Sequence, residues 1–176
     1  TNAENNQITI LSATYLTAFV NIGTEVSGIE NELNRFPVSF STPFEQLLNG
    51  HIAAFSEVFN RFALEIDLSC DPFSQKATNE RIDSMRAGES DDSLLMLYFN
   101  YGRYLMISSS ICGDLPANLQ GKWNLELNPP WQSDYHFDIN LQMNYWMTEP
   151  ANMSECSEAL LMLAESFVPH AKKAAK

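Results

Sequence analysis

Apolar positions repeat every three to four residues from residue 42 onward, and this spacing indicates helices. A first helix is expected to begin at Thr42, because Thr42, Pro43 and Glu45 form a capping box with proline at the first helical position. Its apolar face would carry Phe44, Leu47, Leu48, Phe55, Val58, Phe59 and Phe62, with His51 in the same stripe. We expect a packed or half-buried His51, since no cysteine or carboxylate is spaced to share a metal ion with it.

A second helix is predicted from about 92 to 109, after a polar stretch. Residues 69–93 indicate a long loop or a helix with weak edges. Residues 94–99 are apolar on every side, which is typical of a helix enclosed by other helices. Gly102 predicts close contact with another element, because a glycine in mid-helix costs roughly 1 kcal/mol and is usually compensated by packing.

Two more helices are predicted near the end of the chain. Residues 113–138 hold five prolines and glycines that interrupt regular structure, followed by a third helix from near Asp138 to near Thr148. A fourth helix would have Ser154 as its N-cap and be interrupted by Pro169. Residues 170–176 continue as weakly amphipathic helix with no cap. We take the missing cap as a sign of truncation.

Alternation of side chains predicts a β-strand at residues 7–19, where β-branched and aromatic residues are frequent. Residues 21–41 show little periodicity and indicate a connection, with a short helix over 29–36 as one interpretation. Because a lone strand cannot form a sheet, we expect this strand to be the cut end of a larger β domain.

Net charge restricts the partners of this chain. The 176 residues include 10 basic and 22 acidic side chains, which gives a charge of −12, so phosphate backbones and anionic lipid would be repelled. We therefore expect neither nucleic acid nor a membrane as partner, and no stretch approaches the roughly 18 apolar residues that span a bilayer. The first seven residues lack the basic and apolar regions of a signal peptide.

The cysteines do not suggest a metal site or a disulfide framework. Cys70, Cys112 and Cys156 each lie more than forty positions from the next. A zinc site would need close pairs, and a disulfide framework is usually dense and even in number. We expect three reduced, mostly packed thiols.

Candidate chemistry is densest between residues 113 and 149. This segment holds both aromatic and amide side chains, namely Trp123, Trp131, Trp146, Tyr135, Tyr145, Asn118, Gln120, Asn124, Asn128, Gln132, Asn140, Gln142 and Asn144. Lysine and arginine are absent from 123–171. Indole faces stack on sugar C–H groups and amides bond to hydroxyls, so the composition suits a neutral, polyhydroxylated ligand. The alternative is a structural corner with core aromatics and loop-capping amides.

Three side chains in this segment are spaced by two: Asp134, His136 and Asp138. In an extended chain they would point the same way and present a histidine and carboxylates to a ligand. We expect no metal, because a fourth ligand is not supplied. Asp138 could instead cap the third helix, on which Asn140 and Asn144 share one face. Neither a phosphate loop nor a Gly-x-Ser-x-Gly motif occurs, and no cofactor is expected.

Four runs of residues resemble glycoside hydrolase family 95, the α-L-fucosidases that act chiefly on α-1,2 linkages, with some members acting on L-galactosides. These runs are YGRYL at 101–105, LPANLQGKWN at 115–124, NPPW at 128–131 and INLQMNYW at 139–146. The resemblance covers essentially the whole chain and is strongest from 98 to 161.

The resemblance implies a mainly α fold. The family has an N-terminal β-sandwich, a helical linker, a catalytic (α/α)6 barrel and a C-terminal β domain. Residues 1–41 would then be the end of the sandwich and the linker, 42–112 linker and first helices, and 113–176 the start of an incomplete barrel. The expected fold is a partial (α/α)6 toroid with a helical linker and one strand left from the sandwich.

The resemblance also implies a mechanism. The family hydrolyses with inversion: a glutamic acid protonates the leaving oxygen, and an aspartate helped by two asparagines activates water, which needs roughly 6.5–9.5 Å between the carboxyls. The asparagine pair corresponds to Asp138 and Asn140, with an aspartate replacing the first asparagine. A carboxylate there would repel the base or raise its pKa. His136 corresponds to the sugar-contacting histidine, and Trp123, Trp131 and Asn144 are the other candidates for substrate binding.

The family's acid and base lie downstream of this chain, so residues 1–176 alone are not expected to hydrolyse glycosides. The expected partner is a fucosylated oligosaccharide, and family members are commonly secreted or periplasmic. Apolar helix faces such as Leu160, Leu161 and Phe167 would favour a second copy or the rest of a longer chain as a further partner. A carbohydrate-binding module without catalysis, or a purely structural helical fragment, is the competing interpretation.

Overall fold

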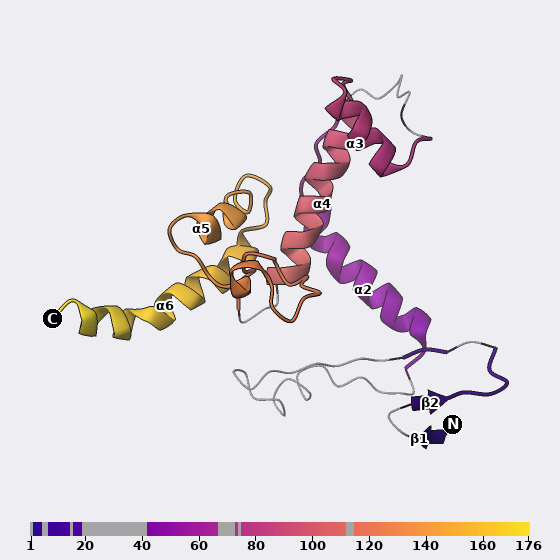
Figure 1. Cartoon of the computed structure of the whole chain (residues 1–176), viewed down its shortest axis with the longest axis horizontal. Helices are drawn as coiled ribbons and strands as arrows, with labels where there is room; N and C mark the ends of the chain where they lie inside the picture. Colours follow the sequence, from indigo (N-terminus) through magenta and orange to yellow (C-terminus); the bar gives the residue numbers. More distant parts are fainter. Residues whose placement is uncertain are drawn as a thin grey trace. The chain divides into compact units, whose positions relative to one another are not determined.

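The computed structural model describes residues 2–4, 7–14, 16–18, 42–66, 73, 75–111 and 115–176 (Figure 1). The chain divides into two compact units, 1–53 and 54–176, and each is described by itself. The described chain is mainly helical, which confirms the expected fold class. None of its described helices is both long enough and apolar enough to cross a membrane.

The N-terminal unit contains a two-stranded antiparallel hairpin instead of one long strand. Strand β1 is Asn2–Glu4, strand β2 is Gln7–Thr9, and Ala3 pairs with Ile8. The predicted strand over 7–19 was therefore wrong beyond Thr9 within the described residues. At Ser12 the backbone turns into the left-handed region with φ of 58°, which ends an extended run. The partner strand escaped prediction because asparagine and glutamate are poor strand formers.

The first predicted helix is present as α2, Phe44–Phe59. The Pro43 carbonyl accepts hydrogen bonds from the N–H groups of Gln46 and Leu47, at 3.1 and 3.3 Å, so the helix starts just after the expected proline. Near its end Phe55 and Phe59 stack with their ring centroids 5.2 Å apart. His51 is exposed, contrary to the expectation of a packed side chain. The short helix considered at 29–36 lies outside the described residues.

A buried ion pair joins the next two helices, α3 (Thr78–Arg86) and α4 (Asp92–Ser110). Arg81 donates from Nε and Nη2 to both carboxylate oxygens of Asp91, at 2.8 and 2.7 Å. Asp91 is also the N-cap of α4, because its Oδ1 accepts the Leu94 N–H at 2.8 Å. One carboxylate thus starts α4 and holds α3, which formed inside the stretch expected to be a loop or weak helix.

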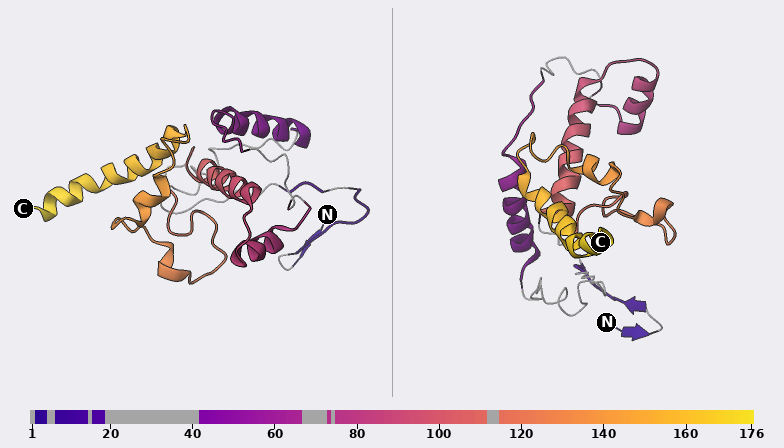
Figure 2. Two further views of the ribbon diagram at one scale, coloured as in Figure 1. Left: turned by 90° about the horizontal axis from the view of Figure 1, so that it is seen from above. Right: turned by 90° about the vertical axis from the view of Figure 1, so that its left-hand side faces the viewer.

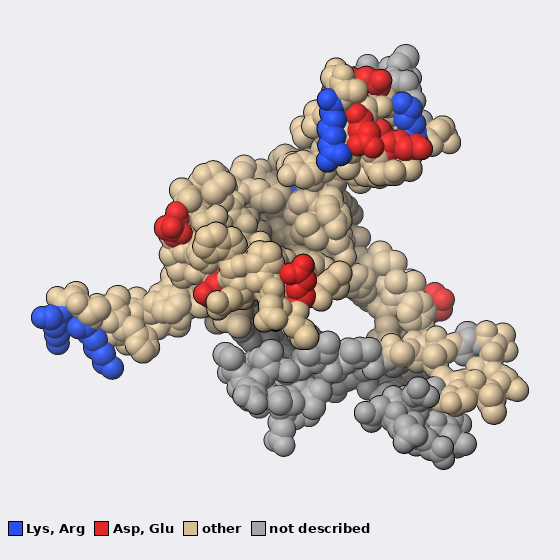
Figure 3. Space-filling model, in the orientation of Figure 1, with Lys and Arg blue, Asp and Glu red and all other residues tan. Residues whose placement is uncertain are grey.

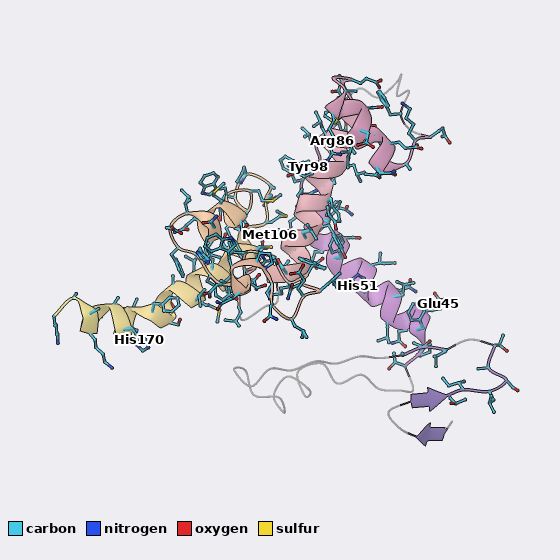
Figure 4. All side chains as sticks on the ribbon, in the orientation of Figure 1. Glu45, His51, Arg86, Tyr98, Met106 and His170 are labelled. Carbon is cyan, nitrogen blue, oxygen red and sulfur yellow. The ribbon has the colours of Figure 1, made fainter. Side chains whose placement is uncertain are left out.

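Helix α4 is not enclosed along its whole circumference, which corrects the expected enclosure. Met106 is 6% exposed and lies among the packed side chains in Figure 4, whereas Tyr98 is 77% exposed. Leu95 and Leu97 are also exposed, so the fully apolar circumference is not covered by the described chain. Gly102 does lie near another element, with Met147 Cε 3.8 Å from where a Cβ would stand, but that is ordinary contact distance and does not demand glycine.

The core of the second unit joins the end of α4 to three C-terminal elements, α5 (Asn140–Tyr145), the 3-10 helix η2 (Ser154–Cys156) and α6 (Ser157–Ala174). Its buried members are Val58, Met106, Ile107, Ala117, Leu141, Tyr145, Ala151, Met153, Cys156 and Leu163. The expectation of a packed thiol is confirmed at Cys156, while Cys70 and Cys112 lie outside the described residues.

The last two helices differ from their predicted bounds. Helix α5 has six residues and gives way to turns at 146–150, so it is shorter than expected. Helix α6 begins at Ser157 with Cys156 as N-cap, not Ser154, and continues through Pro169 (Figure 2). Proline removes one helical hydrogen bond but does not by itself end a helix. Leu161 and Phe167 are exposed as expected, whereas Leu160 packs against the core.

Candidate functional site

A tight turn at residues 118–121 is the centre of the candidate site. The backbone of Asn118 and Gly121 exchanges two hydrogen bonds, at 3.2 and 2.9 Å. The Asn118 side chain also accepts the N–H of Gln120 at 2.9 Å, as asparagine commonly does in turns. Gly121 has φ of +67°, a conformation in which a side chain is strained. The LPANLQGKWN run at 115–124 therefore forms a rigid loop.

Trp123 lies directly against this turn. A Cβ added at Gly121 would stand 2.9 Å from Cε3 of the indole, so only glycine permits the ring to lie this close. The Trp123 N–H donates to the Gln120 carbonyl at 3.2 Å, which fixes the backbone beneath the ring. The side chain remains 47% exposed. One side of the indole is therefore held by the protein while another remains open to a ligand.

Trp131 begins a run of three left-handed residues. The φ angles of Trp131, Gln132 and Ser133 are 54°, 59° and 52°. A left-handed backbone costs an L-residue roughly 1–2 kcal/mol. Local bonds hold the run in place: the N–H of Gln132 donates to Pro129 at 3.0 Å and that of Asp134 to Trp131 at 3.1 Å. Strain of this kind gathers at functional sites, and here it projects an indole that is 76% exposed.

His136 contacts Trp131, so the fold brings these two predicted site residues together. Their rings meet edge to face, with centroids 5.7 Å apart and an interplanar angle of 86°. His136 is half-buried, and its carbonyl accepts the Leu141 N–H at 2.9 Å, which ties it to the start of α5. The result is an imidazole beside an open aromatic surface, an arrangement able to bind a hydroxyl and a C–H face together.

Asp138 and Asn140 lie on either side of a strained residue. Ile139 between them has φ of 117°, which is unusual for a β-branched side chain. Residues 137–139 form a turn, so the extended spacing assumed for Asp134, His136 and Asp138 is not present. Ile139 rather than Asp138 is the N-cap of α5, so the capping alternative for Asp138 was wrong. Both Asp138 and Asn140 are exposed, and their catalytic role stays a prediction.

Asn144 contacts the loop. Its Nδ2 donates to the Asn118 carbonyl at 3.2 Å, and the side chain is partly buried. The Asn144 Nδ2 group, a donor that could bind a sugar hydroxyl, thus joins α5 to the 118–121 turn. The carbonyl oxygen of the same amide remains for a ligand. Its role in substrate binding stays a prediction.

Tyr145 and Tyr135, for which the sequence indicated no separate role, support the loop. The Tyr145 hydroxyl accepts the Ala117 N–H at 2.7 Å and meets the Ser110 hydroxyl at 2.9 Å. Tyr135 donates its hydroxyl to the Pro116 carbonyl at 3.0 Å. Burial raises the pKa of both phenols above their ordinary values. Aromatic composition pointed to these residues, but only the fold shows that their hydroxyls support the loop.

On the face shown in Figure 3, lysine and arginine gather over α3 and at the C-terminal end of α6. No group of three or more histidine, cysteine, aspartate or glutamate side chains is gathered for a metal ion in the part of the chain that the structure describes. The Asp134, His136 and Asp138 spacing therefore does not produce a metal site there.

Comparisons with known proteins agree on one family. Residues 43–176 match the model of the glycosyl hydrolase family 95 catalytic domain. The chain is 36% identical over 158 residues to "Alpha-L-fucosidase 2" of Arabidopsis thaliana, covering 88% of this chain and 19% of that protein. It is 38% identical over 136 residues to "Probable alpha-fucosidase A" of Aspergillus niger, covering 76% of this chain and 17% of that one. The same name belongs to an Aspergillus oryzae protein, 33% identical over 138 residues, with 74% and 18% covered. The chain spans about a fifth of the length of these curated relatives.

Proposed function

Because the chain belongs to glycosyl hydrolase family 95, we propose that it forms part of the sugar-binding floor of an α-L-fucosidase. The enzyme would release terminal α-1,2-linked L-fucose, or a related L-galactose, from oligosaccharides with inversion. The names of the plant and fungal relatives support fucose as the sugar. A fucosylated glycan is the proposed partner.

The arrangement of Trp123, Trp131 and His136 carries this proposal. Both indoles are exposed and lie on the same rigid loop region. The His136 imidazole contacts the Trp131 indole. L-Fucose is neutral and offers an apolar C–H face beside its hydroxyls, which suits indole stacking and hydrogen bonds from uncharged groups. The absence of lysine and arginine from 123–171 disfavours a phosphorylated or carboxylated sugar.

Within this floor, we propose that Asn140 holds the attacking water through its neutral amide. Asp138, at the place of the family's other asparagine, would disfavour ionisation of a neighbouring catalytic carboxylate. No aspartate or glutamate of this chain matches the family's acid and base motifs, so we propose that these two groups come from further polypeptide.

The expected domain division also becomes a proposal. Residues 1–41 would end the β-sandwich and enter the linker, 42–112 would hold the linker and first helices, and 113–176 would begin the (α/α)6 barrel. The match to the catalytic-domain family starts at residue 43, close to the first of these boundaries.

Binding is tested by titrating the chain with L-fucose and following tryptophan fluorescence. We expect a saturable change that D-fucose, the mirror-image sugar, does not reproduce. Trp131→Ala should abolish most of the fluorescence change. Tyr98→Phe, at an exposed position on α4, should leave the fluorescence change intact. Absence of any L-fucose-specific signal would reject the proposed floor.

Catalysis is tested on a 2′-fucosylated oligosaccharide, with the chain alone and with the longest reading frame that contains it. We expect no turnover by residues 1–176 and turnover by the longer product that falls on Asn140→Ala. Turnover by the short chain that Asn140→Ala abolishes would contradict the proposal that the acid and base lie elsewhere.

A further inference from the structure

We propose that Gln120 is a positioning residue that holds both indoles of the sugar-binding floor. The inference rests on the function proposed above and names the residue that sets the geometry of that floor. Gln120 itself does not need to touch the sugar. Its side chain and its backbone connect to the two tryptophan segments separately, and each connection is a hydrogen bond.

The side chain of Gln120 reaches the first segment. Its Nε2 donates to the carbonyl of Pro130 at 3.1 Å, and Pro130 directly precedes Trp131. The backbone carbonyl of Gln120 reaches the second segment, because it accepts the Trp123 N–H at 3.2 Å. The Gln120 N–H is itself held by the Asn118 side chain at 2.9 Å. One residue therefore restrains the backbone at both indoles.

The Trp131 segment needs a restraint from outside. Three consecutive left-handed residues, 131–133, are disfavoured and persist only when the surroundings determine them. The bonds from Gln132 and Asp134 are internal to the segment and would move with it. The Gln120 amide comes from the neighbouring turn, so it fixes the segment relative to the rest of the site.

The orientation of the Gln120 amide follows from its neighbours. Turning the amide over would place its oxygen against the Pro130 carbonyl oxygen, two acceptors facing each other, so the nitrogen must occupy that place. The Oε1 atom is buried and has no hydrogen-bond partner among the described residues. A buried acceptor left unpaired is a cost to stability and calls for an explanation. Positioning of Trp131 is the explanation proposed here.

The turn that carries Gln120 is itself anchored. The Asn118 carbonyl accepts from Nδ2 of Asn144 on α5 at 3.2 Å. Tyr145, the next residue on α5, holds Ala117 just before the turn. Helix α5 thus fixes the turn that contains Gln120, and Gln120 fixes the backbone at both indoles.

The test uses the chain labelled with 5-fluorotryptophan and observed by fluorine NMR. The three resonances of Trp123, Trp131 and Trp146 are assigned by single tryptophan-to-phenylalanine variants. In Gln120→Met, which keeps the length but loses the side-chain donor, we expect the Trp131 resonance to shift or broaden. The resonances of Trp146 and of Trp123, which is bonded to the Gln120 backbone, should stay. The Kd for L-fucose should rise about tenfold, the size of effect expected from losing roughly 1.4 kcal/mol of preorganisation.

Gln142→Met is the matched control. Gln142 also donates its Nε2 to a backbone carbonyl, that of Phe137 at 2.7 Å, and its Oε1 is likewise buried without a partner in the described chain. We expect this control to lower the melting temperature as much as Gln120→Met, with unchanged Trp123 and Trp131 resonances. Should Gln120→Met fail to fold, Gln120→Asn, which keeps the amide but shortens its reach, is expected to move the Trp131 resonance.

The outcomes separate the two proposals. An unmoved Trp131 resonance in a folded Gln120 variant, or equal changes at all three indoles, would overturn the positioning role. If the wild-type chain binds no L-fucose but the Trp131 resonance responds to Gln120→Met, the positioning role stands and the sugar-binding function is rejected.

Discussion

The hydroxyl of Tyr145 accepts a hydrogen bond from the backbone N–H of Ala117, with 2.7 Å between oxygen and nitrogen. Tyr145 belongs to α5 and is 5% exposed, while Ala117 begins the loop that carries the candidate site. The same hydroxyl meets Ser110 at the end of α4 at 2.9 Å. A single interior oxygen therefore joins two helices to the loop, and the site depends on the core beneath it.

Tyr145→Phe should lower the free energy of unfolding by about 1–3 kcal/mol. The substitution leaves the Ala117 N–H buried without an acceptor, which costs roughly that amount. Urea denaturation measures the change, with Tyr98→Phe as a control at a 77% exposed position on α4. Equal midpoints for the two variants would show that the hydroxyl does not support the loop.

Gly121→Ala should displace Trp123. A methyl group at position 121 meets the indole at 2.9 Å and sits on a backbone with positive φ, so both sterics and conformation oppose it. We expect a loss of about 1–3 kcal/mol in stability, typical of overpacking, and a changed Trp123 environment by fluorescence. Gly50→Ala in α2 has nothing within 4 Å and should be neutral or gain up to about 1 kcal/mol. A tolerated Gly121→Ala with unaltered fluorescence would count against the close contact.

Stability should fall in acid through Asp91. The Arg81 guanidinium, together with the Leu94 N–H, holds the pKa of that carboxyl well below its usual range. As pH falls below about 4, the unfolded chain binds the proton while the folded chain does not, so unfolding is favoured. The stabilisation that ionised Asp91 contributes is complete above about pH 4. It is lost as the pH falls towards the lower pKa that Asp91 has in the folded chain.

Asp91→Asn should remove this acid-dependent loss and reduce stability at neutral pH. The neighbouring exposed Asp92→Asn serves as the control. Unfolding free energies are measured by urea denaturation from pH 3 to pH 7. An unchanged pH profile in Asp91→Asn would mean that the buried pair does not produce the acid sensitivity.

Arg103 should not tolerate lysine. Its guanidinium is buried, donates to the Phe59 carbonyl, and lies over the Phe59 ring at 4.3 Å and the Phe62 ring at 5.6 Å. Burial lowers the pKa of the Arg103 guanidinium from its usual value. The ring faces and the Phe59 carbonyl stabilise the buried positive charge. Lysine has no flat face to stack and fewer donors, and we expect a loss of about 2 kcal/mol.

The matched control for Arg103→Lys is Arg86→Lys, an exposed arginine paired with Asp83 on the surface of α3. That change should cost less than about 0.5 kcal/mol. Thermal unfolding of both variants compares them directly, and similar melting temperatures would argue against a specific role for the guanidinium face.

Local patterns predicted the helices well where packing agreed with them. The apolar periodicity placed α4 within one residue of its observed end, since hydrophobic spacing and a good N-cap at Asp91 act together. The same reasoning failed at Pro169, because a missing hydrogen bond weakens a helix without ending it. It also failed at the described residues 10–14 and 16–18, where β-forming side chains found no described partner strand.

Within the candidate site, the sequence alone determined the family and predicted the kind of ligand chemistry, because motifs and a cation-free run of indoles and amides are properties of composition and order. Only the tertiary structure decided which groups are used internally. The amide nitrogens of Asn144 and Gln120 bind backbone carbonyls 26 and 10 residues away, and a left-handed backbone presents Trp131 beside His136. Which of these contacts form depends on which segments meet in three dimensions, and a local sequence pattern does not contain that information.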